Sequence, residues 1–479
     1  MSGDLTLGYL LSKSNNPILT KAYLYTTEIR VIHTAQIYGL VFRFCNDWHT
    51  VRVISTAIIY LLILASYYFL CRQAGIKKYF AISAALYILP LSNEYANWFL
   101  FPMYYAFHFV ATFLTLGLVI KYVKSKNKIV LTVLAVFSLL MGLNGIRVLL
   151  VLTMPLLVCS VIYYFVNRKK EGALHFVIAS AITFFISVIG VGIYVKIIEP
   201  AYGSLKTYFE ITDLNYSSLA ETIQGYLYLL GYSTGPVTGA VMISNLFCLI
   251  TVILIIFSII QFFKRKQENS IQAVIVAGFF VCAFLLFEGL YFVTDMGYAT
   301  RYCLPFFIAN IPMVLIILNE NKKISERQKM ILCLFVMGVA ILVAKDKYFS
   351  FKYADYTKDN REITEYLLGT EYLEGYMGTS CALTEFSNGV LKVYGWKPGD
   401  FENQKDIDIL EPHNQPRERL ERKPEGKIFV IMDKPSYNIW TFRDVITLDY
   451  LIYETDNKYV FGFDSYDSFK SLTLQSANL

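Results

Sequence analysis

The segment Thr294-Asp-Met-Gly-Tyr-Ala-Thr-Arg-Tyr-Cys-Leu-Pro-Phe306 places a single arginine, Arg301, between two apolar runs that are long enough to cross a bilayer. A guanidinium keeps its proton in proteins, and an unpaired one near hydrocarbon is costly. Arg301 is therefore expected either to reach the membrane interface as an anchor or to bind an anion. In the second case it would clamp a phosphate, with Tyr298 and Tyr302 shielding the pair from water.

The composition of the whole chain is that of a membrane protein. Of its 479 residues 56% are hydrophobic, and the mean hydropathy is +0.47, which is too high for an ordinary soluble globule. The net charge of +6 comes from Lys and Arg in short loops between apolar runs, so it does not indicate nucleic-acid binding. The eight cysteines lack metal or disulfide spacing, and the chain has no Walker A loop, zinc motif or nucleophile elbow.

Apolar runs recur along most of the chain and predict a polytopic α-helical membrane protein with about ten spans. The runs at 80–91 and 129–142 are short for a bilayer. The expected spans are residues 51–70, 80–91, 104–122, 129–142, 148–166, 174–197, 239–263, 271–293, 302–318 and 330–344.

Lys and Arg gather in every second loop between these runs, and the alternate loops are not basic. Because basic loops stay in the cytoplasm, both ends of the chain are expected on the extracytoplasmic side of a bacterial plasma membrane. No signal peptide precedes the first loop. We therefore expect a further membrane span that is missing upstream of this sequence.

The chain divides into three parts. Residues 1–50 form the first extracytoplasmic loop, where apolar positions at helical spacing suit helices lying in the interface plane. Residues 51–344 form the transmembrane domain. Residues 345–479 are rich in charge and are long enough for a core of their own, so they predict a small extracytoplasmic α+β domain.

Within this last part, a short helix is expected at 362–368. Alternating runs bounded by Gly, Pro and Asp predict strands at 390–393, 427–432 and 458–463. Cys381 is the only cysteine there, so no internal disulfide is expected.

Ionisable residues at the extracytoplasmic ends of the spans need an explanation, because such groups are costly in membranes and often functional. The modest interpretation of Glu28 and Arg30 is a solvated charged face. Arg147 would then only snorkel, and Glu288 would belong to a buried structural ion pair. The candidate site residues are Asp4, Glu28, Arg30, Glu94, Arg147, Glu288, Tyr298, Arg301 and Tyr302.

Carboxylates and arginines at the mouth of a lipid-exposed cavity suit one reaction well. A sugar carried on a polyprenyl phosphate presents the phosphate in the membrane and the anomeric carbon above it. A carboxylate can take the proton of the acceptor hydroxyl, and arginines can stabilise the departing phosphate. Such a reaction needs no soluble nucleotide site, in agreement with the missing Gly-rich phosphate loop.

Two short motifs accompany this plan, Arg301-Tyr-Cys-Leu-Pro305 and Gly142-Leu-Asn-Gly-Ile-Arg147 with Pro155 after it. With them, the chain resembles the GT-C superfamily of integral-membrane glycosyltransferases, which use polyprenyl-phosphate sugars. It is similar in plan to the protein O-mannosyltransferase and aminoarabinose-transferase branches and to other bacterial membrane proteins of that type. The first motif resembles the Arg-Tyr-x-x-Pro run that opens a late span in many members.

In these families the catalytic acid lies early in the first outer loop, just after the first span. The resemblance therefore gives the role of general base to Asp4 and that of a supporting acid or acceptor contact to Glu28. It gives donor phosphate binding to Arg301, with Arg147 as a second candidate. The chain departs from the family pattern in two respects, because no span precedes Asp4 and no Asp-Asp or Asp-Glu pair is present.

The resulting hypothesis is a membrane glycosyltransferase that moves a sugar from a polyprenyl-phosphate donor to an extracytoplasmic acceptor. The acceptor would be a cell-wall or surface glycan, a lipid-linked glycan or a protein. No compact acidic triad is visible, so metal-independent chemistry is favoured over a divalent metal cofactor. The partners expected are the lipid bilayer, the lipid-linked sugar and the acceptor, and no nucleic acid.

Other functions would leave different marks. A flippase or transporter for a lipid-linked glycan predicts polar groups in both halves of the membrane and often inverted repeats, whereas the unusual polar groups here lie at one side. A polysaccharide polymerase or ligase shares the large outer loop and the arginines. A membrane sensor with an outer domain would leave Asp4 and Arg301 without a shared cavity.

Overall fold

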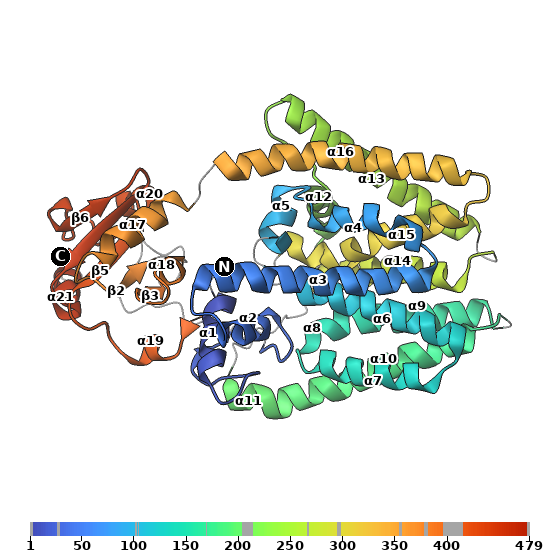
Figure 1. The fold of residues 1–479 in the computed structure, drawn as a ribbon, viewed down its shortest axis with the longest axis horizontal. Helices are drawn as coiled ribbons and strands as arrows, with labels where there is room; N and C mark the ends of the chain where they lie inside the picture. Colours follow the sequence, from blue (N-terminus) through green and yellow to red (C-terminus); the bar gives the residue numbers. More distant parts are fainter. Residues whose placement is uncertain are drawn as a thin grey trace.

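The computed structural model of the protein describes residues 3–25, 29–100, 103, 105–168, 170–203, 214–265, 268–294, 298–353, 357–377, 382–395 and 415–476. Its helices form an elongated bundle, and a smaller domain built on a sheet lies at one end of that bundle (Figure 1). We call the end of the bundle that carries this domain the domain end, and the opposite end the basic end.

In the described part of the chain, eight helices are long and apolar enough to cross a membrane, which confirms a polytopic helical membrane protein. Many of their large apolar side chains are exposed, as a surface that faces lipid requires. The eight spans are α3 (Trp48–Ala74), α6 (Ala106–Ser125), α8 to α9 (Ile146–Val166), α10 to α11 (Ala173–Tyr202), α13 (Gly239–Lys264), α14 (Ile271–Val293), η5 to α15 (Thr300–Glu320) and most of α16 (Glu326–Tyr353).

Polar caps mark where several of these helices begin. Asp47 accepts a hydrogen bond from the backbone N–H of Thr50 and starts α3. Thr238 and Ser270 cap α13 and α14 in the same way. Each cap satisfies one of the backbone donors that a helix leaves unpaired at its start, which explains why the helices begin at these positions.

Two further apolar helices, α4 (Phe80–Ile88) and α7 (Lys128–Gly142), are shorter than the spans, as the sequence predicts. After α4, α5 (Asn93–Tyr95) and the π-helical segment η2 (Ala96–Leu100) continue the chain at the domain end. The short helix α7 packs closely on α10, since a Cβ on Gly142 would lie 2.3 Å from the carbonyl oxygen of Ser187. Such contacts between backbones are typical of helix pairs in membranes.

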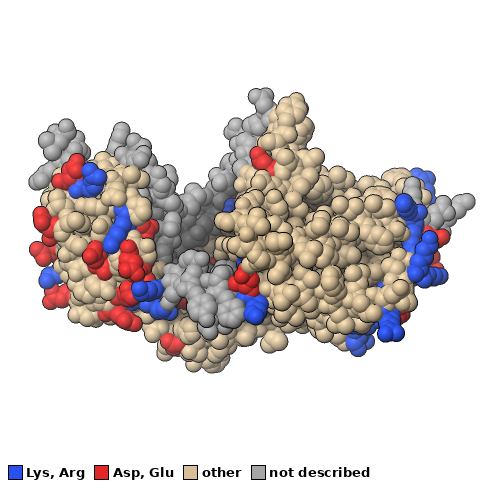
Figure 2. All heavy atoms as spheres, turned by 90° about the horizontal axis from the view of Figure 1, so that it is seen from above, with Lys and Arg blue, Asp and Glu red and all other residues tan. Residues whose placement is uncertain are grey.

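Charge is distributed unevenly along the bundle. Lys and Arg side chains gather at the basic end, and the sides of the bundle in this view are almost free of charge (Figure 2). This is the pattern that the alternation of basic loops in the sequence predicts.

Several short elements lie at the domain end, between or beside the spans. Gly8 and Gly39 let the first two helices approach closely, because a Cβ on Gly8 would lie 2.5 Å from Cβ of Tyr38. The short elements are α1 (Gly3–Lys13), α2 (Thr34–Phe42), α8 (Ile146–Val148), η3 (Leu149–Thr153), η4 (Tyr194–Ile198), α11 (Glu199–Tyr202), α12 (Ser218–Leu229) and η5 (Thr300–Cys303). Within the spans, α9 (Met154–Val166) follows η3, α10 (Ala173–Ile193) precedes η4, and α15 (Leu304–Glu320) follows η5. The short helix η1 (Lys77–Tyr79) lies at the basic end.

The C-terminal domain is an α+β unit around a five-stranded mixed sheet, as the sequence predicts. The strand order is β3-β2-β5-β7-β6. Strands β3, β2 and β5 are parallel to one another, and β7 is antiparallel to both of its neighbours, β5 and β6. Residues alternate between the two faces of β5, so Phe429 and Val430 belong to different apolar cores. The elements are α17 (Lys358–Leu368), β2 (Glu374–Met377), α18 (Ala382–Phe386), β3 (Lys392–Gly395), β4 (Gln415–Pro416), α19 (Glu418–Glu421), β5 (Ile428–Asp433), α20 (Lys434–Asn438), η6 (Leu448–Tyr450), β6 (Leu451–Glu454), β7 (Lys458–Phe463) and α21 (Tyr466–Ser476).

This domain is fastened to the first residues of the chain. The Arg52 guanidinium makes a two-pronged ion pair with Glu385, and the Trp48 N–H donates to the side chain of Asn388 at 2.9 Å. Strand β1 (Tyr23–Leu24) pairs antiparallel with β4. The segment that carries Asp4 is therefore held between the bundle and the C-terminal domain.

Candidate functional site

Asp4 lies in the first turn of α1, with 17% of its side chain exposed. Its Oδ2 accepts a hydrogen bond from the Thr34 hydroxyl at 3.0 Å and lies 3.6 Å from Nδ1 of His33. Burial, and then the Asp4 charge beside it, raise the pKa of Tyr38 to about 12, so this phenol is neutral at physiological pH. Oδ1 of Asp4 accepts no hydrogen bond from any described residue and is available to a substrate.

A directed chain of hydrogen bonds links Asp4 to Arg30. Nη1 of Arg30 lies 2.8 Å from Nε2 of His33, and a guanidinium can only donate, so Nε2 is the acceptor and the proton of His33 resides on Nδ1. Nδ1 lies 3.0 Å from Oγ1 of Thr34, which donates in turn to Asp4. The chain therefore holds His33 as a neutral ring between the cation and the carboxylate.

Asn144 joins this chain to the turn between α7 and α8. Its side chain accepts from the Ile32 N–H at 2.8 Å and donates to the Ile32 carbonyl at 3.1 Å. The turn that presents Asn144 contains Gly145 at φ +94°, a backbone conformation that favours glycine. Arg147 follows on α8, and the π-helical turn η3 comes directly after it.

A small cavity lies where these pieces meet. Its volume of about 10 Å³ is roughly that needed by one water molecule, so a sugar or phosphate would have to enlarge it. The residues lining it are Arg30, His33, Phe107, His108, Asn144, Arg147 and Val148. We call these residues together with Asp4 and Thr34 the Asp4 group.

Arg301 lies in η5, within a second set of polar and aromatic side chains. The guanidinium carbon is 4.9 Å from the ring centre of Trp98 and 5.2 Å from that of Tyr302, a cation–π arrangement. The Trp98 indole N–H donates to Glu94 at 2.9 Å. Among the described residues no carboxylate lies within ion-pair distance of Arg301. We call Arg301, Trp98, Tyr302 and Glu94 the Arg301 group.

Glu288 and Tyr298 border the Arg301 group on α14 and the loop before η5. Glu288 accepts a hydrogen bond from Ser218 of α12 at 2.5 Å, and its second oxygen is buried without a hydrogen bond. The Tyr298 hydroxyl lies 3.6 Å from Sγ of Cys303 and packs against Gly225, where a Cβ would collide with it. These contacts tie α12 to α14 and to the loop that holds Arg301.

The structure distributes the predicted site residues over two groups. Asp4, Arg30 and Arg147 come together in one, whereas Arg301, Glu94 and Tyr302 form the other. Between the described residues of the two groups no hydrogen bond or ion pair is found. Glu28 lies outside the described residues, and so does Asp295 beside Arg301.

His33, Thr34 and the interaction of Asn144 with Ile32 complete the Asp4 group, and sequence reasoning assigned them no role in it. The short spacing between Arg30 and His33, both in the bend before α2, is the one signal that could have linked them. No local pattern links Asn144 to its partner Ile32, because the two lie far apart in the chain. Among the described residues no group of three or more His, Cys, Asp and Glu side chains is placed to hold a metal ion.

No protein-family model matches the chain, and no curated protein matches it either. The class of the protein therefore follows from its fold, which is that of a multi-pass integral membrane protein with a C-terminal α+β domain.

Proposed function

We propose that the protein is a membrane glycosyltransferase of the GT-C type, which transfers a sugar from a polyprenyl phosphate to an acceptor outside the cytoplasm. The observation that supports this most is the Asp4 group, where a carboxylate with one available oxygen is linked through Thr34 and His33 to Arg30. Arg30 and Arg147 line the same small cavity. Because basic loops mark the cytoplasmic side, we assign the domain end to the outside of a bacterial plasma membrane.

In the proposed reaction, Oδ1 of Asp4 takes the proton of the acceptor hydroxyl while the acceptor oxygen forms a bond to the anomeric carbon. The bond between that carbon and the phosphate oxygen breaks, and polyprenyl phosphate leaves with the electron pair. Arg30 and Arg147 face the cavity in which the phosphate charge would be stabilised. The cavity must widen to admit the donor, and such changes of shape on substrate binding are common in enzymes.

The role of His33 in this scheme is to orient Arg30. The neutral ring of His33 accepts a hydrogen bond from the Arg30 guanidinium, and Thr34 fixes the ring on its other side. These contacts hold Arg30 in one orientation. Glu28 is retained as a supporting acid or acceptor contact, and Arg301 as a second cation for the donor phosphate. The C-terminal domain, which is fastened beside Asp4, would bind the acceptor or cover the cavity.

The test is a transfer assay with the purified protein in lipid nanodiscs and a panel of polyprenyl-phosphate sugars, followed by mass spectrometry of the released polyprenyl phosphate. One donor is expected to be consumed, and Asp4→Asn is expected to lower its turnover about 10²- to 10⁴-fold, the usual contribution of a general base. Asparagine keeps an acceptor for Thr34, so the fold should be retained.

Asp467→Asn, an exposed change on α21, is the matched control and should leave turnover unchanged. Full transfer by the Asp4→Asn variant would remove Asp4 from the mechanism. Failure of the wild-type protein to consume any donor of the panel would count against the glycosyltransferase proposal as a whole.

A further inference from the structure

A long apolar cavity runs inside the membrane part of the bundle, away from the Asp4 group. It lies between α4, α13, α15 and α16 and has a volume of about 80 Å³. On α15 its lining extends from Phe307 to Leu318, a distance of about 16 Å at the rise of an α-helix. This length is about half of the ~30 Å hydrocarbon thickness of a bilayer, so it corresponds to one leaflet.

The shape and the lining of this cavity favour a hydrocarbon chain. Apart from a few polar side chains such as Ser83, Thr251 and Asn310, its walls are aliphatic or aromatic. The hydroxyls of Ser83 and Thr251 already donate to backbone carbonyls of their own helices, so they make few demands on an occupant. Because three of its walls, α13, α15 and α16, are membrane spans, the molecules best placed to reach the cavity are those dissolved in the bilayer.

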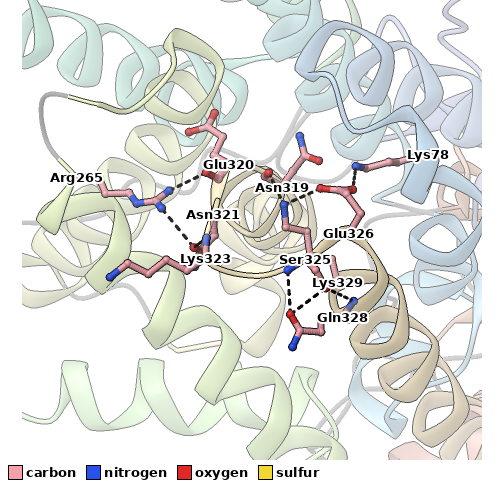
Figure 3. A network of polar contacts seen from close by, with 10 residues as sticks. All are labelled: Lys78, Arg265, Asn319, Glu320, Asn321, Lys323, Ser325, Glu326, Gln328 and Lys329. Carbon is pink, nitrogen blue, oxygen red and sulfur yellow. Dashed lines mark hydrogen bonds and ion pairs between the residues drawn. The ribbon is translucent and has the colours of Figure 1, made fainter.

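At one end the cavity is lined by Tyr79, Leu318 and Leu332, which lie next to the loops of the basic end. Figure 3 shows the polar network there, in which Glu326 is engaged by both Lys78 and Lys329. Lys329 also donates to the Asn319 carbonyl at 2.8 Å, and Arg265 to the Glu320 carbonyl at 3.1 Å. These contacts fix the loop between α15 and α16, and they pair the carboxylate of Glu326 with two lysines.

Other cations at this rim have no carboxylate partner among the described residues. Lys322, Lys323 and Arg327 are exposed on or next to the fixed loop, and Lys77 is exposed at the start of η1. Their charges lie at the depth of lipid headgroups, since α15 and α16 end and begin there. Cations at that level attract anionic lipids.

We propose that this cavity and its rim form a binding site for one anionic phospholipid of the cytoplasmic leaflet. One acyl chain lies in the cavity, and the phosphate headgroup contacts Lys322 and Lys323 with Arg327 beside them. The site is separate from the proposed transfer reaction and does not depend on it.

The experiment uses the full chain in detergent and titrates it with phosphatidylglycerol or with phosphatidylcholine, followed by native mass spectrometry. One phosphatidylglycerol is expected to bind in preference to phosphatidylcholine. The double variant Lys322→Gln/Lys323→Gln should weaken phosphatidylglycerol binding roughly tenfold or more and remove the preference. The control Lys121→Gln/Lys128→Gln removes two exposed cations from another loop of the basic end and should leave it unchanged.

A second variant tests the cavity itself. Ile311→Trp fills it from α15 and should weaken binding of both lipids, whereas Val133→Trp, on the exposed face of α7, should not. Apparent melting temperatures identify any variant that fails to fold. If the two double lysine variants lost phosphatidylglycerol binding equally, the lipid would be attracted to the basic surface in general. If Ile311→Trp left lipid binding unchanged, no acyl chain would enter the cavity. Either outcome would overturn the proposal.

Discussion

The Asp4 group and the Arg301 group lie at the same end of the bundle but satisfy their charges in different ways. In the first, each donor in the chain from Arg30 through His33 and Thr34 has a matched acceptor. In the second, the guanidinium of Arg301 rests on two aromatic rings and has no described carboxylate partner. A charge already tied into a network can orient neighbours, whereas a charge held only by ring faces can still accept an anion.

This difference suggests a division of work within the proposed function. The Asp4 group would carry the proton transfer, because its geometry is fixed before the substrate arrives. The Arg301 group would contribute mainly to holding a negative charge. The following variants test that division in the transfer assay and in unfolding measurements.

Among these variants the largest effect is expected for Arg301→Gln, which keeps a polar but shorter side chain and removes its charge. Removing the guanidinium that hydrogen-bonds to the donor phosphate should lower kcat/KM by about 10- to 100-fold, mostly by raising KM. Arg72→Gln, an exposed change at the end of α3, is the control. If kcat fell with KM unchanged, Arg301 would belong to the chemistry and the division would be wrong.

Asn144→Ala should have the next largest effect, this time on stability. It leaves the partly buried N–H and carbonyl of Ile32 without partners, at a cost of about 1 kcal/mol for each group, the low end of the range for buried groups. The apparent melting temperature should fall, and transfer should fall with it because the segment carrying His33 is released. Asn127→Ala at the exposed start of α7 is the control, and a loss no larger than in that variant would contradict the structural role of Asn144.

A smaller effect, dependent on pH, is expected at the start of α3. The hydroxyl and N–H of Thr50 lower the pKa of Asp47, so this carboxylate stabilises the fold above its ordinary pKa of about 4. The contribution is lost as pH falls through the lowered pKa of the folded state. Asp47→Ala should therefore destabilise by roughly 1 kcal/mol at pH 7 and by less at pH 3.

Thermal unfolding of the wild-type protein and of the Asp47→Ala variant at pH 7 and pH 3 measures how much stability the substitution costs at each pH. Thr238→Ala removes a cap that does not titrate in this range, so its effect should not vary with pH in the same way. A cost of Asp47→Ala that stays constant between pH 7 and pH 3 would show that the charge of Asp47 is not involved.

The smallest effect is expected for Glu94→Gln, which still offers an oxygen to the indole N–H of Trp98. If Glu94 only holds Trp98 beneath Arg301, transfer should change by no more than about twofold, since an amide can replace a carboxylate as acceptor. Glu94→Leu should then be clearly worse. Equal, large losses in the two variants would show that the negative charge itself takes part.

The fold was largely predictable, because hydropathy and charge act over lengths that can be read directly along the chain. The long apolar runs became spans, the basic loops gathered at one end, and the C-terminal part folded around a mixed sheet. The strands expected at 427–432 and 458–463 correspond to β5 and β7. The sequence did not reveal β2 and β6, which are only four residues long.

The candidate site was predictable only in part. The alternation of basic loops indicates which residues share a side of the membrane, but not which of them touch. Arg147 and Arg301 were expected at one phosphate, but Arg147 lines the cavity of the Asp4 group and Arg301 contacts the rings of Trp98 and Tyr302. The bond between Asn144 and Ile32 joins distant parts of the chain, so no local pattern announces it.

The pairing of Tyr23 with Pro416 also has a consequence for biosynthesis. A ribosome makes the first of these residues long before the second, at roughly 5–20 residues per second. The segment next to Asp4 must therefore remain incompletely paired until almost the whole polypeptide has emerged. A prematurely terminated chain could insert its spans normally and would still lack the strand that fastens its opening segment in place.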